Sequence, residues 1–251
     1  MSSLPPDVPP PPPPPTGAPP PSPYAPYVPA AAGLPWEMRP QVGFADALVD
    51  TIRLFVTSPA EAWSRTREKG DLGQPLLFAV LVGWIGVAFN SVWSLIFGNM
   101  WLRFLPMLPP EVRDQAALRG IGTGLGSTLF ALVLAPLFVI VGLFVSSAIL
   151  HVCFMIVGAL SGSTAGFEGT FRVVGYSSVS QLAQAIPVVG GLVAMIWNLV
   201  LVVMGAQRIH RTTQGKAIAG VLIPIVLCCG CAILAILFAG AAILAAISGH
   251  R

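Results

Sequence analysis

Charged residues are scarce in this sequence. Asp, Glu, Lys and Arg together make up 9% of its 251 residues, and the formal net charge is only +3. So small a net charge, without a basic tail or stripe, argues against nucleic acid as a partner. Apolar residues instead reach 55% of the chain, and the mean hydropathy is +0.81. This composition predicts an integral membrane protein embedded in the lipid bilayer.

Cysteines and catalytic signatures are also sparse. The four cysteines, at positions 153, 228, 229 and 231, all lie in apolar runs, which argues against a disulfide framework or a redox pair. The chain contains no GxSxG, HExxH or P-loop spacing. We therefore predict a protein that is not an enzyme and that carries no cofactor or metal.

Proline is concentrated at the N terminus, where residues 1–40 hold 17 of the 25 prolines. Such a segment adopts polyproline II conformation and buries too little surface to fold. We therefore predict a disordered arm over residues 1–40. A semi-rigid spacer is the favoured interpretation, and a ligand for an aromatic groove is the alternative. Because the arm has no apolar signal-peptide core, we expect it to stay in the cytoplasm.

Residues 41–75 are predicted to form short amphipathic helices on the cytoplasmic side. Between Phe44 and Phe55, apolar residues recur on one helical stripe and charged residues lie opposite. Residues 58–61 (Ser-Pro-Ala-Glu) have the form of a capping box, so a second helix is expected from there to Lys69. These helices lie at the headgroup level, pack on the membrane domain, or do both, and the sequence does not separate these interpretations.

Apolar segments dominate the membrane domain, residues 76–251. Leu76–Phe97 has 22 residues without a charge, about 33 Å of helix against a hydrocarbon core of about 30 Å. The third segment is interrupted by serines and glutamines. Five crossings place nine basic residues inside and four outside, whereas four crossings give seven and six, so the positive-inside rule favours five. The expected fold is all-α and polytopic, with its C terminus outside and spans over 76–97, 127–150, 173–189, 190–207 and 219–247.

Polar side chains inside the predicted spans are candidates for function. One interpretation is a polar pathway for a transported solute, and the other is hydrogen bonding between helices. The second is favoured because no acidic residue lies deep in any span, as a proton- or sodium-coupled transporter usually requires. The residues concerned are Asn90, His151, Gln181, Gln184 and Asn198.

Two helical spacings predict further contacts. Glu168 and Arg172 are four residues apart and form an ion pair just before the third span, which either neutralises a helix end or holds a headgroup or partner. In the fifth span, small residues repeat every three or four positions and form a seam for close helix packing, within the bundle or between copies. The seam consists of Ala232, Ala235, Ala239, Ala242 and Ala246.

Two short motifs carry a family resemblance. Asp71, Leu72 and Pro75 belong to a DLGQP segment directly before the first span, and Tyr176 and Pro187 belong to Gly-Tyr-Ser and Ile-Pro in the third. In combination they resemble the D-L-x-x-P and Y-S…I-P elements of the Yip domain family, multi-span membrane proteins named for interaction with Ypt/Rab GTPases. The chain looks most like the bacterial branch of that family.

The resemblance implies five spans, a cytoplasmic N terminus and a C terminus on the other side of the membrane. For eukaryotic members it also implies vesicle trafficking through GTPase binding and hetero-oligomers. The Ala-, Pro- and Arg-rich composition is typical of a GC-rich bacterium. We therefore expect a scaffold or adaptor of the bacterial cytoplasmic membrane, or of ER and Golgi membranes if the source is eukaryotic. It would act through protein partners or self-association. The alternative is a small-solute or lipid transporter or channel.

Overall fold

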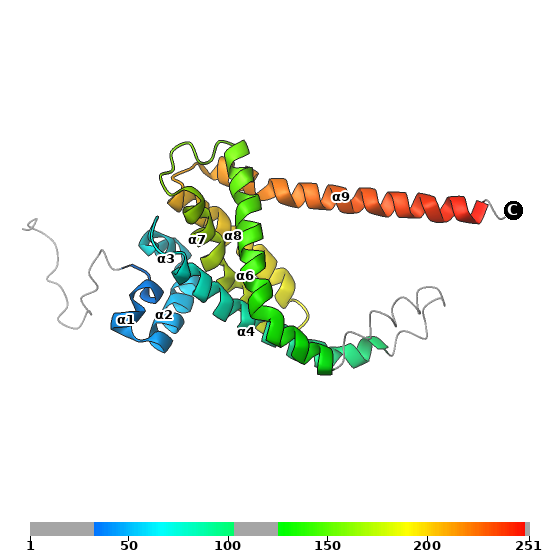
Figure 1. The fold of residues 1–251 in the computed structure, drawn as a ribbon, viewed down its shortest axis with the longest axis horizontal. Helices are drawn as coiled ribbons and strands as arrows, with labels where there is room; N and C mark the ends of the chain where they lie inside the picture. Colours follow the sequence, from blue (N-terminus) through cyan, green and yellow to red (C-terminus); the bar gives the residue numbers. More distant parts are fainter. Residues whose placement is uncertain (1–32, 103–124, 249–251) are drawn as a thin grey trace, which may run out of the picture. The chain divides into compact units, whose positions relative to one another are not determined.

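The chain is all-helical wherever the structure, a computed structural model, describes it. The described residues are 33–102 and 125–248, and no strand occurs among them, which confirms the predicted all-α fold. The elements, drawn in Figure 1, are η1 (Pro35–Met38), α1 (Arg39–Val42), α2 (Phe44–Thr57), α3 (Pro59–Arg65), α4 (Gly73–Leu102), α6 (Leu125–Ile156), α7 (Gly166–Ser177), η4 (Ser178–Ala185), α8 (Gly190–Ile209) and α9 (Gln214–Ser248).

Within the described residues, four helices are long and apolar enough to cross a membrane. They are Gly73–Phe97, Leu125–Ile156, Gly190–Ile209 and Gln214–Phe238. Each has at least the roughly 20 residues that a hydrocarbon core requires. They correspond to the first, second, fourth and fifth predicted spans, and the chain is therefore a multi-pass membrane protein.

The predicted third span, 173–189, is not one of these four helices. It consists of the end of α7 followed by the 3₁₀ helix η4. Serine side chains favour this break, since the Ser178 hydroxyl donates to the Gly175 carbonyl oxygen at 2.6 Å and competes with the regular helical pattern. The helical segment ends before Pro187, where Val188 adopts φ 65° and the Val189 N–H donates to the Pro187 carbonyl.

This broken helix nevertheless runs beside α4. Gly175 lies against Pro75, and the Trp93 indole N–H donates to the Gln184 carbonyl oxygen at 3.0 Å. From Pro75 to Trp93, α4 rises about 27 Å. Eight of the twelve residues of α7 and three of the eight residues of η4 are buried. The segment is therefore a central element of the bundle, with polar residues where a lipid-facing span would have apolar ones.

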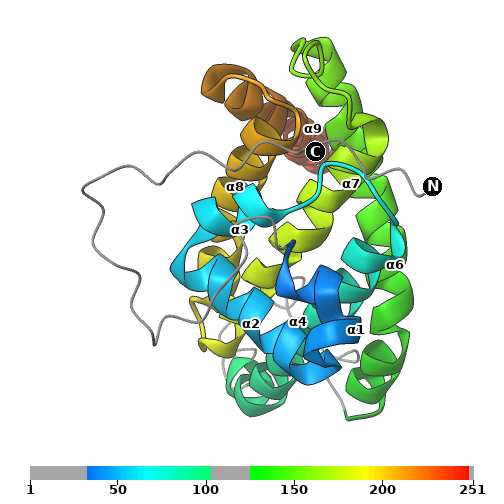
Figure 2. The same cartoon turned by 90° about the vertical axis from the view of Figure 1, so that its left-hand side faces the viewer.

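The helices α2 and α3 pack on the membrane helices, and α1 lies next to α2 (Figures 1 and 2). Phe55 of α2 and Trp63 of α3 are buried, with ring centroids 5.1 Å apart, and Phe55 also stacks on Tyr176 of α7 at 6.1 Å. Packing on the domain, one of the two arrangements that the sequence allowed, is thus observed. We call the end of the bundle that carries these helices the α3 end.

The predicted capping box and helix end are wrong. Ser58 makes no side-chain capping bond, and the Glu61 carboxylate pairs with Arg65 one turn later, at 2.5 Å, instead of turning back to the Ser58 N–H. The helix α3 ends at Arg65 rather than Lys69, since Thr66 adopts extended backbone angles of φ −69° and ψ 129°.

The predicted disordered arm is wrong at its C-terminal end. Residues 35–42 form η1 and α1, and the side chains of Leu34 and Trp36 are fully buried. Leu34 and Trp36 bury enough apolar surface to hold this segment on the bundle, which the prolines alone do not. The remainder of the predicted arm, residues 1–32, lies outside the described residues.

The predicted alanine seam finds no partner helix where its side chains are described. Ala232 and Ala235 are exposed on α9, as are their large apolar neighbours such as Ile236. The side chains of Ala239, Ala242 and Ala246 lie outside the described residues. At Ala232 and Ala235, packing within this chain is therefore not observed.

Close packing of α3 on α8 depends on Gly205. A Cβ atom there would lie 2.7 Å from the ring of Trp63, which Phe55 confines from the other side. We expect Gly205→Ala to lower the free energy of unfolding by about 1–3 kcal/mol, measured by denaturation in detergent micelles. Gly142→Ala is the matched control, because no atom lies within 4 Å of its Cβ position. Equal effects of the two substitutions would contradict this account.

Candidate functional site

A buried ion pair joins the N-terminal segment to the membrane bundle. Arg172 of α7 donates from Nη1 to Glu37 Oε1 at 2.7 Å, and the two side chains are 1% and 2% exposed. The Tyr176 hydroxyl, one turn further along α7, donates to the same carboxylate oxygen at 3.0 Å. We call Glu37, Arg172 and Tyr176 the Arg172 cluster. It connects a residue of η1 to the central element of the bundle.

The remaining donors of Arg172 hold the loop before α4. Its Nη2 donates to the Asp71 carbonyl oxygen at 2.9 Å, and its Nε donates to Glu168 at 3.4 Å. Glu168 also accepts a hydrogen bond from the Gly70 N–H. Gly70 has φ 144° and leaves no room for a Cβ, which would lie 2.7 Å from Arg172 Nη2. The predicted Glu168–Arg172 pair is present, but Glu37 is the closer partner of Arg172.

The two sequence motifs meet at this cluster. The Asp71 carboxylate accepts from the Gly73 N–H at 2.9 Å at the start of α4, and Leu72 packs with Phe171 of α7. Pro75 is buried against Gly175, where a Cβ would lie 2.9 Å from the proline. Segments about a hundred residues apart thus form one site. Pro187 is not part of it, since it follows the far end of η4.

Aromatic rings surround the cluster and lower its local dielectric constant. Tyr176 lies 5.4 Å from the Phe78 ring and 6.1 Å from the Phe55 ring. Burial raises the pKa of the Glu37 carboxyl above its ordinary value, although the Arg172 guanidinium opposes this shift. Glu37 Oε2 accepts no hydrogen bond from the described residues, and Arg67 Nε is 3.7 Å away. The carboxylate therefore depends chiefly on Arg172 and Tyr176.

Trp36 fixes the same segment through its backbone and its ring. Its backbone N–H donates to the Thr51 hydroxyl on α2, and its indole N–H donates to the Gln74 carbonyl oxygen, both at 2.8 Å. The Arg39 guanidinium lies over the indole, 4.8 Å from the ring centroid. Residues 34–37 are consequently held by α2, α4 and α7 together.

A second polar cluster at the α3 end is a chain of four hydrogen-bonded side chains. Ser163 Oγ lies 2.8 Å from His210 Nδ1, and Thr170 Oγ1 lies 3.0 Å from His210 Nε2 and 2.8 Å from His151 Nδ1. We call Ser163, His210, Thr170 and His151 the histidine chain. It connects α6, α7, the end of α8 and the loop between α6 and α7.

Burial of His210 makes the stability of the fold dependent on pH. Desolvation lowers the pKa of this fully buried imidazole from 6.5 to about 4, and His151 adds to the shift. The folded chain keeps His210 neutral while the unfolded chain protonates it below its ordinary pKa. We therefore expect the free energy of unfolding to fall as the pH drops from about 6.5 to about 4, by up to about 1.4 kcal/mol per pH unit. Above pH 6.5 this contribution is constant.

The comparison that checks this is denaturation of the protein and of His210→Gln between pH 4 and 7.5 in the same detergent. The difference between their pH slopes isolates His210 from the carboxylates that titrate in the same range. Identical slopes would contradict a neutral, buried His210.

The polar residues predicted inside the spans lie in different parts of the bundle. Asn90 and Gln184 line one cavity of about 450 Å³ at the far end of α4 from the α3 end. Asn198 accepts a long 3.4 Å bond from Ser180 and lines another cavity, of about 270 Å³. Gln181 packs against Gly86, and His151 belongs to the histidine chain. Among the described residues, these five side chains do not share one cavity.

Sequence reasoning missed Glu37, Thr170 and His210. Glu37 lies in the proline-rich segment for which we predict disorder, yet it follows a tryptophan and is one of only two acidic residues before position 41. That Trp-Glu pair is the signal that indicates a fixed segment. Nothing local to Thr170 or His210 predicts their contact, because each lies on a different element.

Comparison with known proteins identifies one family. A family model described as the Yip1 domain matches residues 52–247, which confirms the family expected from the DLGQP and Gly-Tyr-Ser segments. Neither the curated proteins nor the solved structures contain a match to the chain.

Proposed function

Because the chain belongs to the Yip1 domain family, we propose that it is a non-enzymatic membrane scaffold that presents a rigid cytoplasmic surface to protein partners. Family membership supports a membrane protein of the Yip type. The scaffold role rests on how α1–α3 are attached and on what they leave uncovered.

Charge supports the orientation that we propose. Basic residues gather at the α3 end, where Arg208 and Arg211 of the α8 terminus pair with Glu68 and where Lys216 donates to the Gly158 carbonyl oxygen at 3.1 Å. Arg172 lies at the same end. The positive-inside rule places such an end in the cytoplasm. We assign the protein to the bacterial cytoplasmic membrane with α1–α3 on its inner side.

An uncovered apolar stripe on α2 is the observation that carries the proposal. Val49 and Val56 are 60% and 53% exposed, although both lie on a helix outside the four long apolar ones, and their spacing of seven residues places them on one face of α2. The opposite face of α2 is buried on the bundle, so this stripe cannot turn inward. Apolar surface that remains exposed on a firmly attached helix is typical of an interaction site.

Transport is the less favoured function. The five intramembrane polar side chains lie in separate places, and two of them, His151 and Asn198, bond to side chains of neighbouring helices, as structural polar residues do.

The scaffold proposal is tested by purifying the tagged protein from its native membranes into nanodiscs and identifying stoichiometric partners by mass spectrometry. We expect a partner that is lost in Val49→Asp and Val56→Asp. Ala60→Asp is the control, because it adds the same charge at an exposed position of the neighbouring α3. A preparation without any stoichiometric protein, or a partner retained in all variants, would contradict the proposal.

A further inference from the structure

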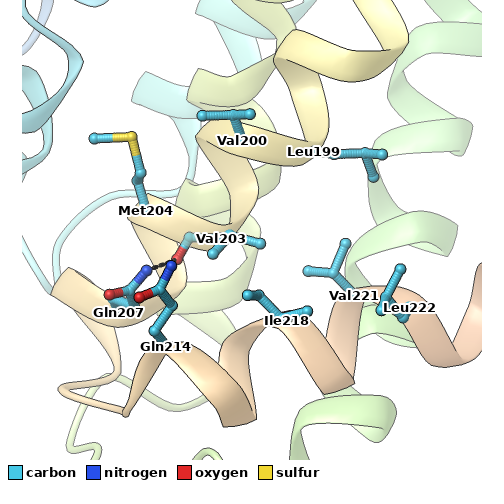
Figure 3. Close-up of a pocket in the computed structure, with 9 residues that line it drawn as sticks. All are labelled: Leu199, Val200, Val203, Met204, Gln207, Gln214, Ile218, Val221 and Leu222. Carbon is cyan, nitrogen blue, oxygen red and sulfur yellow. Dashed lines mark hydrogen bonds between the residues drawn. The ribbon is translucent and has the colours of Figure 1, made fainter.

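The helices α8 and α9 enclose a groove of about 330 Å³ on the membrane part of the protein. Its walls are apolar, formed among others by Val203 and Met204 of α8 and by Ile218 and Leu222 of α9. Figure 3 shows Gln207 and Gln214 next to each other at one end of the groove, with the apolar side chains along the rest. The groove is therefore amphipathic along its length.

The side-chain amides of Gln207 and Gln214 have donors and acceptors that are not used within the described residues. Gln207 donates only a long 3.4 Å bond to the Val203 carbonyl oxygen, and the Gln214 amide makes none with the described residues. Each side-chain amide has two N–H donors and an acceptor oxygen. Together they offer donors to the ester or phosphate oxygens of a ligand whose apolar part lies in the groove.

The position of the amides matches the surface of a bilayer. Both helices are long and apolar enough to span a membrane, Gln207 is two residues from the end of α8, and Gln214 is the first residue of α9. The apolar walls then lie at the depth of the acyl chains. A lipid in this groove has its glycerol region beside the two glutamines.

Charge indicates the kind of headgroup. Arg208, Arg211 and Lys216 lie at the glutamine end, and among the described residues the two arginines pair with one carboxylate, that of Glu68. The surplus of positive charge favours an anionic headgroup. The volume argues against a protein helix as occupant, because a helix with its side chains is about 10–12 Å across and a 330 Å³ groove is at the small end of ligand sites.

We propose that this groove binds one anionic glycerophospholipid, with an acyl chain between Val203 and Ile218 and headgroup oxygens at Gln207 and Gln214. The site lies on the membrane helices and does not depend on the α2 stripe or on any protein partner.

The test uses the full chain in nanodiscs of phosphatidylcholine that contain a minor fraction of phosphatidylglycerol with a diazirine in the middle of one acyl chain. After illumination, the cross-linked peptides are mapped by mass spectrometry. We expect the label to be concentrated around Val203 and Ile218. An even distribution that includes the exposed face of α6 around Val133 would overturn the proposal, because it would indicate bulk lipid only.

Two substitutions check the site from opposite walls. Ile218→Trp and Val203→Trp each fill the groove and are expected to lower labelling there by about tenfold. Ile236→Trp is the matched control, since it adds the same ring to an exposed position of α9 outside the groove. If folded Ile218→Trp and Val203→Trp proteins are labelled as strongly as Ile236→Trp, the proposal is wrong.

The double variant Gln207→Leu/Gln214→Leu is expected to lose the preference for phosphatidylglycerol over an equivalent phosphatidylcholine probe, and an unchanged preference would refute the headgroup assignment.

Discussion

Arg172→Ala is expected to lower the free energy of unfolding by about 3–5 kcal/mol. The substitution removes the buried cation of Glu37 and leaves only the exposed Arg67 guanidinium at 3.7 Å, and it also removes the donor to the Asp71 carbonyl oxygen. An uncompensated buried charge costs far more than the pair contributes when intact. Denaturation of the purified protein in detergent micelles, followed by circular dichroism, measures the change.

A surface ion pair provides the matched control. Arg65 pairs with Glu61 at a similar distance of 2.5 Å, but both side chains are partly exposed, and Arg65→Ala is expected to cost less than about 1 kcal/mol. The double variant Glu37→Leu/Arg172→Met is expected to recover most of the stability, since it removes both charges and keeps apolar volume. An Arg172→Ala protein no less stable than Arg65→Ala would show that the cluster does not hold the fold.

The long apolar helices could be predicted because their signal is local. Length and hydropathy within one segment decide whether a helix suits the bilayer, so four of the predicted spans overlap helices that are long and apolar enough to cross it. The third segment shows the limit of this reasoning. Its serines and glutamines can lie inside the bundle only because α4 and α8 pack over them. That packing is a tertiary contact, which the sequence of the segment alone does not predict.

The Arg172 cluster shows why only part of the site could be predicted. Helical spacing selects Glu168 as the partner of Arg172, since residues four apart share a helix face. The closer partner, Glu37, is 135 residues away in sequence, on a different element. The DLGQP and Gly-Tyr-Ser motifs were recognised separately, but only the fold shows that Pro75 touches Gly175. Local rules thus identified the residues of one helix and missed the segment that binds to it.

Trp36→Ala is expected to release this segment and to lower the free energy of unfolding by about 3–5 kcal/mol. The substitution empties a fully buried site between Phe44 and Phe78 and removes the indole bond to the Gln74 carbonyl oxygen. Because the segment is attached mainly by Trp36 and Glu37, we expect it to open before the bundle does. Limited proteolysis with thermolysin in detergent, read out as cleavage between residues 33 and 44, measures that opening.

Trp36→Phe separates the two contributions of the indole. Phenylalanine keeps most of the ring contacts and loses only the hydrogen bond to Gln74, so its cost is expected to be about 1 kcal/mol and its cleavage close to that of the unmodified protein. Trp36 and Arg172 hold the same segment through different contacts. Trp36→Ala already releases Glu37 from Arg172, so Arg172→Ala in the same protein removes fewer contacts. The destabilisation of the double variant should therefore be smaller than the sum of the two single effects. Strict additivity of the two substitutions would mean that the segment does not move as one unit.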